Sequence, residues 1–298
     1  MKSYLLALDG SRESLLAAEL AWQLAESNKA KVVAQTVVDS QSLWVFIGKD
    51  LPGIIGNGPY LAAHEAIYSA LKMVSDTLLL AYEARAQGHN VECETVLDEG
   101  NTLDEITKRA KQNALVIMGH RRERDEHPGL PRYSLAQHLA YVCPTPLLIV
   151  QDPCEKWKTA RLIVNENTFD VSTLNAFLEF AKALNLSQEI YCIATEESAA
   201  KFIAKVRSMI PTSEKVHVLS SEWEEGDPAW ECATDVPAST LLVVATQDSK
   251  EGRKTCAGTD PGSFIHCLTL PAAVILPESK AVTESLSVVG QTKSSSKK

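Results

Sequence analysis

The chain has 298 residues, of which 45% are hydrophobic and 22% are charged. This composition is typical of a globular protein, excludes disorder over the whole chain, and leaves room for two domains of about 150 residues each. The 38 acidic and 29 basic side chains give a formal net charge of -9, and no basic patch stands out, so we expect no nucleic-acid partner. The apolar runs fall far short of the roughly 20 residues of a membrane helix, so we expect no membrane partner either.

The N-terminus and the cysteines favour a cytoplasmic protein. Met1 leads directly into a strand-like run, without the charged and apolar segments of a secretory signal. Seven cysteines are an odd number, and no two of them form a Cys-x-x-Cys pair. We therefore expect reduced thiols, most of them buried as small apolar side chains, and no metal site.

In the first half, short apolar runs alternate with helical patterns, which is typical of parallel strands joined by crossover helices. The predicted strands are Tyr4 to Leu8, Lys31 to Val38, Asn90 to Leu97, Ala114 to Met118 and Pro146 to Val150. Two helices are predicted to cover the sheet with apolar residues at helical spacing: Leu15, Leu16, Leu20, Ala21 and Leu24, and then Ile67, Leu71, Val74, Leu78 and Tyr82. The pattern predicts a doubly wound α/β layer structure.

The second half repeats this pattern in a shorter form. Its predicted strands are Arg161 to Val164, Glu189 to Ala194, Lys215 to Leu219, Leu241 to Ala245 and Ala272 to Leu276. Gly119 and Val150 are 31 positions apart, as are Ala245 and Leu276, but Asp9 to Gly119 spans 110 positions and Asn165 to Ala245 only 80. We expect the missing residues to correspond to the connection from Asp39 to Tyr60 and the long helix after it.

These patterns divide the chain into domain 1 at residues 1–150, a linker at 151–160, domain 2 at 161–278 and a disordered tail at 279–298. Trp157 in the linker is expected to pack on a domain. The lysines of the tail leave a targeting role open beside that of a solvated terminus. The apolar run Leu43 to Ile47 is open to two interpretations, a lid on its own domain or a contact with a partner.

Ligands of open parallel sheets bind beyond the carboxyl ends of the strands. In domain 1 this edge carries Asp9, Gly10 and Ser11 after the first strand, and Val38 at the end of the second. Gly119 ends the fourth strand, and Ser134 is placed to cap the next helix. The N-terminus of that helix would favour an anion.

Three segments together resemble the universal stress protein family, in a form with two copies in tandem. They are Leu5-Leu6-Ala7-Leu8-Asp9-Gly10-Ser11, Val38-Asp39, and Ala114 to Gly119 followed by Cys143-Pro144-Thr145-Pro146 and Leu147 to Val150. The resemblance covers nearly all of residues 1–278. It implies two five-stranded parallel sheets of order 3-2-1-4-5, and in nucleotide-binding members a Gly-x2-Gly-x9-Gly-Ser/Thr motif after the fourth strand.

Both copies depart from that motif. In domain 1 Gly119 and Ser134 match, after a one-residue insertion, but Arg122 stands at the second glycine. Arg122 offers a guanidinium for phosphate, or it belongs to a solvated loop.

In domain 2 Ala245 and Asp248 replace two glycines, Gly258-Thr259 remains, and Asn165 stands in place of the first aspartate. We therefore expect nucleotide binding, with ATP as the candidate ligand, in domain 1 only. The candidate residues are Asp9, Gly10, Ser11, Val38, Gly119, Arg122 and Ser134.

The resemblance implies a cytosolic regulatory or stress-response module that binds rather than reacts, with an unidentified protein client. One alternative is a protein-interaction module that binds no nucleotide, and another is a slow ATPase. No catalytic constellation is found, so we expect no enzyme. The family's use of the fifth strand implies that Pro146 to Val150 and Ala272 to Leu276 pair, either within the chain or in a homodimer.

Overall fold

The computed structural model describes residues 2–39, 58–121, 134–167, 169–210, 216–222, 236–249, 252–257 and 259–277. The first half consists of β1 (Ser3–Leu8), α1 (Arg12–Asn28), β2 (Lys31–Val38), α3 (Gly58–Gly88), β3 (Cys93–Glu99), α4 (Thr102–Ala110), β4 (Leu115–Gly119), α5 (Leu135–Val142) and β5 (Leu147–Val150). The second half consists of β6 (Thr159–Asn165), α6 (Val171–Ala183), β7 (Ser187–Ala194), α7 (Glu196–Met209), β8 (Val216–Glu222), β9 (Thr240–Ser249), β10 (Gly252–Thr255), α8 (Pro261–His266) and β11 (Ala272–Leu276).

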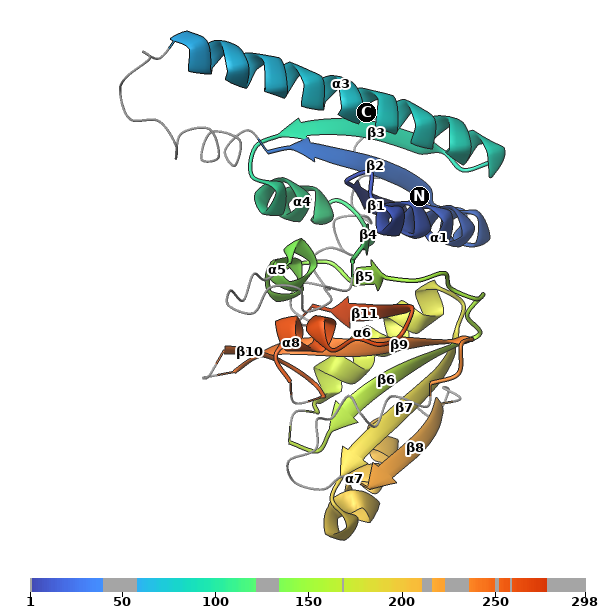
Figure 1. The fold of residues 1–298 in the computed structure, drawn as a ribbon. Coiled ribbons are helices and arrows are strands. Elements are labelled where there is room, and N and C mark those ends of the chain that lie inside the picture. Colours follow the sequence, from blue (N-terminus) through green and yellow to red (C-terminus); the bar gives the residue numbers. More distant parts are fainter. Residues whose placement is uncertain are drawn as a thin grey trace, which may run out of the picture.

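The described strands form one continuous sheet in the order β3-β2-β1-β4-β5-β11-β9-β6-β7-β8, with β10 paired to β9 (Figure 1). The five main strands of each half are parallel and have the predicted order 3-2-1-4-5, which confirms the expected α/β fold, and β10 runs antiparallel to β9. The halves join edge to edge, because β11 runs antiparallel to β5 with Val274 opposite Leu148. The two predicted sheets are therefore one sheet, and the pairing covers two fully buried apolar edges.

Helices cover both faces of this sheet and enclose two hydrophobic cores. One core lies under α1, α3, α6 and α7, and the other lies under α4, α5 and α8. The central strands have consecutive buried residues, as Leu147 to Val150 illustrate, because both of their faces are covered. Helix α1 lies close to the sheet through small residues such as Ala17 and Ala21, and its predicted core residue Leu15 is instead 43% exposed.

The main difference between the halves is the helix after the second strand. Helix α3 has 31 residues, whereas its counterpart α7 has 14. This places part of the shortening where the sequence predicts it. The predicted core face of α3 is wrong in its N-terminal part, since Ile67, Leu71 and Val74 are 41%, 43% and 65% exposed. Figure 1 shows why: this part of α3 extends beyond the strands, and only its later turns pack on β2 and β3.

The connection between the halves is shorter than predicted. Strand β6 begins at Thr159, inside the predicted linker, and Trp157 is only 9% exposed and packs into the first core. The predicted tail and the Leu43 to Ile47 run lie outside the described residues. Within the described ranges, no helix combines the length and the apolar character needed to cross a bilayer.

Candidate functional site

The loop after β1 forms a tight turn that starts α1. The Asp9 Oδ1 atom accepts a hydrogen bond from the Ser11 amide at 2.9 Å, and the Ser11 Oγ atom accepts one from the Ser14 amide at 3.1 Å. Gly10 between them has a φ of +79°, in the left-handed region that glycine adopts without strain. Asp9 therefore shapes the turn, and Ser11 caps the helix.

Gly119 at the end of β4 lies against the first turn of α1. A Cβ atom at this position would overlap with backbone atoms of Glu13 and Ser14. The glycine is therefore required for the close approach of β4 to α1, whatever else the site binds. Packing alone thus explains the motif glycine that the sequence retains.

A cavity of roughly 480 Å³ lies at the carboxyl ends of β1, β2 and β4. This size is in the range of small-molecule sites. Helix α3 supplies one wall through Leu71, Val74 and Leu78, and α4 and α5 contribute to the other. The lining residues from the strands and their adjoining loops are Ala7, Leu8, Asp9, Gly10, Gln35, Thr36, Val37, Val38, Asp39, Met118 and Gly119.

Two buried polar atoms on β2 belong to residues that line this cavity. The Thr36 Oγ1 atom and the Gln35 Oε1 atom form no hydrogen bond within the described part of the chain. Thr36 is 6% exposed and Gln35 is 1% exposed, so bulk water satisfies neither atom. Buried polar atoms without a partner are costly. Because successive side chains of a strand point to opposite faces, Thr36 lies on the α3 side of the sheet and Gln35 on the α4 side.

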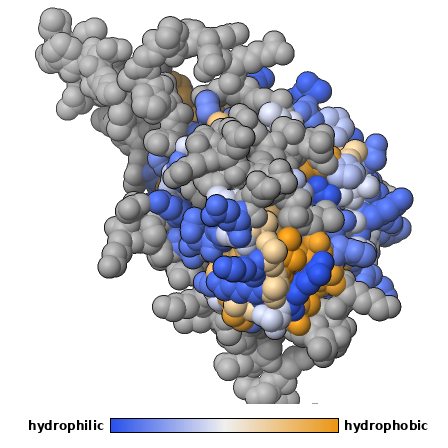
Figure 2. Space-filling model, turned by 90° about the horizontal axis from the view of Figure 1, so that it is seen from below, coloured by the Kyte–Doolittle hydropathy of each residue, from blue (hydrophilic) through white to orange (hydrophobic). Residues whose placement is uncertain are grey.

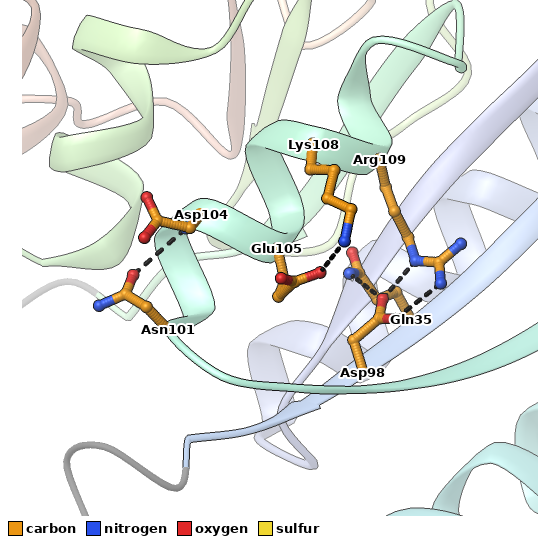
Figure 3. Close-up of polar contacts among 7 residues, drawn as sticks. All are labelled: Gln35, Asp98, Asn101, Asp104, Glu105, Lys108 and Arg109. Atoms are coloured by element: carbon orange, nitrogen blue, oxygen red, sulfur yellow. Dashed lines mark hydrogen bonds and ion pairs between the residues drawn. The ribbon is translucent and has the colours of Figure 1, made fainter.

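Gln35 also belongs to an ion-pair cluster that fixes α4 beside the cavity (Figure 3). Asp98 on β3 accepts hydrogen bonds from the Arg109 guanidinium of α4, with 2.7 Å between Arg109 Nη2 and Asp98 Oδ1, and from Gln35 Nε2 at 2.7 Å. The Arg109 hydrogen bonds hold the pKa of Asp98 below its usual value. Asn101 starts α4 by accepting from the amides of Leu103 and Asp104.

Ser134 caps α5, as the sequence predicts, and forms a full capping box with Gln137. The Gln137 amide donates to Ser134 Oγ at 3.3 Å, and the Ser134 amide donates to Gln137 Oε1 at 2.6 Å. Gln137 Nε2 also donates to the Gly262 carbonyl oxygen of the second half at 3.2 Å. The N-terminus of α5 is therefore tied to α8.

The second half repeats the turn after its first strand but fills the space above it. Asn165 Oδ1 accepts from the Asn167 amide at 2.9 Å, as Asp9 does from Ser11. The Asn165 amide then donates to the Cys256 carbonyl oxygen at 2.7 Å, and the Cys256 amide donates to the Ala245 carbonyl oxygen at 2.7 Å. The chain after β10 thus lies between the ends of β6 and β9.

We call this segment around Cys256, between the ends of β6 and β9, the plug of the second half. The Cys256 side chain completes it. Its Sγ atom donates to the Ile163 carbonyl oxygen at 2.9 Å and accepts from the Ala245 amide at 3.1 Å, and burial raises the pKa of the thiol to about 12. Cys256 is fully buried. A thiol this buried serves packing rather than reactivity.

The next helix, α8, differs from the sequence alignment by one residue. The motif alignment places the cap at Thr259, but the N-cap of α8 is Asp260, whose Oδ1 accepts from the Ser263 amide at 2.9 Å. Thr259 instead lies 2.9 Å from Thr255 through their hydroxyl oxygens. Asp260 also accepts a hydrogen bond from the Tyr141 hydroxyl of α5, so the second half uses this position to bind the first.

The structure brings most of the candidate residues together. Asp9, Gly10, Val38 and Gly119 line the cavity, Ser11 lies in the same turn, and Ser134 immediately precedes Leu135, another lining residue. Arg122 lies outside the described residues. Sequence reasoning missed Thr36 and Gln35, although polar residues inside an otherwise apolar strand were a visible signal. It also missed β10 and the Cys256 plug, which had no recognisable signal.

Comparison with known proteins agrees with this architecture. No curated protein sequence matches the chain. A universal stress protein from Archaeoglobus fulgidus superimposes with a TM-score of 0.60 at 14% identity, over 92% of this chain and 98% of that one. A second, from Pseudomonas aeruginosa, gives 0.50 at 11% identity over 98% of both chains. A third, crystallised in complex with cAMP, gives 0.32 at 23% identity over 50% of this chain and 97% of its own.

The sequence profile of the universal stress protein family matches residues 1–151. This segment contains the β1 turn, the cavity and the fifth strand. The chain therefore belongs to the universal stress protein family.

Proposed function

We propose that this protein is a regulatory stress-response module that binds a small adenine compound in its first half only. One observation carries the proposal: the first half has an open cavity at the carboxyl ends of β1, β2 and β4, whereas Cys256 fills the corresponding place in the second half. The cavity has the volume and the apolar walls typical of small-molecule sites.

The contacts between the halves suggest how ligand binding in the first half affects the second half. Helix α5, whose first residue Leu135 lines the cavity, contacts α8 through Gln137 and Tyr141. A ligand that orders the cavity wall also acts on this interface, and through it on the second half. The proposal is one of binding and signalling without a chemical step.

Thermal unfolding with adenosine, AMP, ADP and ATP, each with and without magnesium, tests the proposal. At least one compound should raise the melting temperature, and the shift should grow with the logarithm of the free ligand concentration above the Kd. Val74→Trp should abolish this shift, because Val74 lines the cavity and is 65% exposed, so the larger ring fills the cavity without disturbing the core.

Met73→Trp is the matched control. Met73 is the neighbouring residue of α3, is 64% exposed and does not belong to the cavity lining. This variant should retain the ligand-induced shift. An equal loss of the shift in both variants, or no shift with any compound, contradicts the proposed site.

A second candidate function is a protein-interaction module without a nucleotide. Figure 2 shows the molecule from below, the end at which α7 and β8 lie in Figure 1, and hydrophobic side chains gather there between hydrophilic ones. Ile203 of α7 and Val216 and Val218 of β8 are apolar and only partly buried. Absence of binding by all four adenine compounds favours this alternative.

A further inference from the structure

Helix α3 is longer than the strands beneath it require. Its 31 residues span about 46 Å, whereas the 8 residues of β2 span about 26 Å. The helix packs on β2, β3 and α1 through one face, on which Leu79, Tyr82 and Ala86 are buried. Figure 1 shows α3 at the end of the molecule, with none of the described helices and strands beyond its opposite side.

That opposite side, which we call the outer face of α3, has the residue spacing of a helix that packs against another helix. Its residues recur at alternating intervals of three and four positions, and all are exposed: Ala63, Ala66, Ala70, Met73, Thr77, Leu80 and Ala84. The large apolar side chains among them, Met73 and Leu80, are 64% and 65% exposed. None of the seven is charged, although a solvated helix face is normally rich in charged residues.

The outer face can be buried without leaving polar groups or charges unpaired. The Thr77 Oγ1 atom donates a hydrogen bond to the Met73 carbonyl oxygen at 2.8 Å, so the hydroxyl already has its acceptor inside the helix. The net charge of -9 makes two copies of the chain repel each other, and this repulsion is weakest at an uncharged face. Both features suit contact with a second copy of the chain.

The outer face is also complementary in shape to itself. In an antiparallel pair of α3 helices with a two-fold axis at the level of Ser75, a residue before Ser75 meets the residue equally far after it in the other copy. Leu80 then meets Ala70 of the second copy, and Met73 meets Thr77 of the second copy. Each larger side chain has a smaller one opposite, as the packing of knobs into holes requires.

From these observations we propose that the protein forms a homodimer in which the outer faces of two α3 helices pack antiparallel. The dimer leaves the fifth strands untouched, since β5 and β11 already pair within the chain. Two helices about 10 Å wide, in contact over about 33 Å from Ala63 to Ala84, bury on the order of 1,000 Å² in total, which is at the lower end of specific interfaces. We therefore expect a reversible dimer with a micromolar Kd.

Sedimentation velocity of the full chain, over about 1 to 200 μM, tests the proposal. The dimer fraction should rise with concentration, and Leu80→Glu should raise the Kd at least about tenfold, because it buries a carboxylate opposite Ala70. Leu15→Glu makes the same change at a leucine of α1 that is 43% exposed, and it should leave the Kd unaltered. A wild type that stays monomeric, or equal effects of the two substitutions, overturns the proposal.

Mixing two variants tests the antiparallel arrangement. Ala70→Lys alone should be monomeric, but an equimolar mixture with Leu80→Glu should dimerise, because the new lysine meets the new glutamate while the second contact between positions 70 and 80 stays native. Thr77→Lys is the control, since its lysine lies opposite Met73, and its mixture with Leu80→Glu should remain monomeric. Failure of the first mixture to dimerise, or dimerisation of both mixtures, overturns the antiparallel pairing.

Asp76 provides a test of the position of the axis. It is exposed beside the outer face and follows Ser75, so the dimer brings the Asp76 carboxylates of the two copies near each other. Asp76→Asn should therefore lower the Kd several-fold. Glu179→Gln on α6 makes the same charge change at an exposed site of the second half and should have little effect. Equal effects of these two substitutions contradict an axis at Ser75.

Discussion

The Asn165 amide donates a hydrogen bond to the Cys256 carbonyl oxygen at 2.7 Å, which closes in the second half the crevice that stays open above Asp9 in the first. The two halves share strand order and the same turn after the first strand. They differ after the fourth strand, where the second half forms the β9–β10 hairpin and returns Cys256 to the sheet. The two halves thus have the same strand order but differ at this edge of the sheet, where the first half has a cavity and the second has Cys256.

Removing the plug's side chain should destabilise the protein. Cys256→Ala deletes the donor to Ile163 and the acceptor for the Ala245 amide in a fully buried place. We expect a loss of about 2 kcal/mol in the free energy of unfolding, measured by urea denaturation.

Cys267→Ala at the end of α8 is the control for this prediction. Its side chain is only partly buried, so its effect should stay within about 0.5 kcal/mol. Equal stability of the Cys256→Ala variant and the wild type contradicts the structural role of the thiol.

Gly119→Ala should destabilise the first half because the added Cβ atom overlaps sterically with neighbouring backbone atoms. The new Cβ atom meets backbone atoms of Glu13 and Ser14, which cannot rotate away as a side chain does. A loss of at least about 2 kcal/mol is expected in chemical denaturation.

Gly88→Ala provides the comparison. Gly88 is the last residue of α3, and no atom lies within 4 Å of a Cβ placed there. It should be neutral or slightly stabilising, because alanine favours the helix. If both alanine variants unfold at the same denaturant concentration, the close approach of β4 to α1 is not needed.

The Asp98–Arg109 pair should make stability depend on pH. The pKa of Asp98 is lowered, chiefly by the Arg109 hydrogen bonds, so its contribution is complete above the unfolded-state value of about 3.9 and disappears as pH falls through the folded-state pKa. Asp98→Asn should lower the free energy of unfolding by about 2 kcal/mol at pH 7. The difference in stability between this variant and the wild type should shrink below about pH 4. Denaturation curves at pH 7, 5 and 3 measure this difference in stability. A difference that is constant across this pH range contradicts a stabilising ion pair.

The contact between the halves predicts an effect of Tyr141→Phe. This substitution removes the hydroxyl that donates to Asp260 and keeps the ring. Burial raises the pKa of Asp260, but the hydrogen bonds from Ser263 and Tyr141 outweigh it and hold the pKa below its usual value. The variant should lose about 1.5 kcal/mol at neutral pH, and chemical shift titration should show the Asp260 pKa moving upward.

Tyr191→Phe on β7 is the matched control. The Arg161 guanidinium lies over this ring, 5.5 Å from its centroid, and the phenylalanine keeps that contact. Stability should change little. An unaltered Asp260 titration in the Tyr141→Phe variant contradicts the hydrogen bond between the halves.

Local patterns were sufficient for the strands, because a strand buried on both faces must be continuously apolar. The strand order came from the resemblance to the family. Local patterns were insufficient for α3, where Leu71 and Val74 have the spacing of a core face but are 43% and 65% exposed and line the cavity. Periodicity predicts which side of a helix is apolar, and only the position of the helix decides what that side meets.

The sequence by itself determined two α/β units, the turn at Asp9 to Ser11 and the cap at Ser134, because each depends on residues close together in the chain. The general location of the cavity followed from the rule that ligands of parallel sheets bind beyond the carboxyl ends of the strands. Tertiary structure decided that β5 and β11, which the sequence expected to pair either within the chain or in a homodimer, pair within the chain, that Gly119 lies against Glu13, and that Cys256 lies between the strand ends of the second half. These features unite residues distant in the sequence. Their physical basis is close packing and the pairing of buried polar groups, which no local pattern encodes.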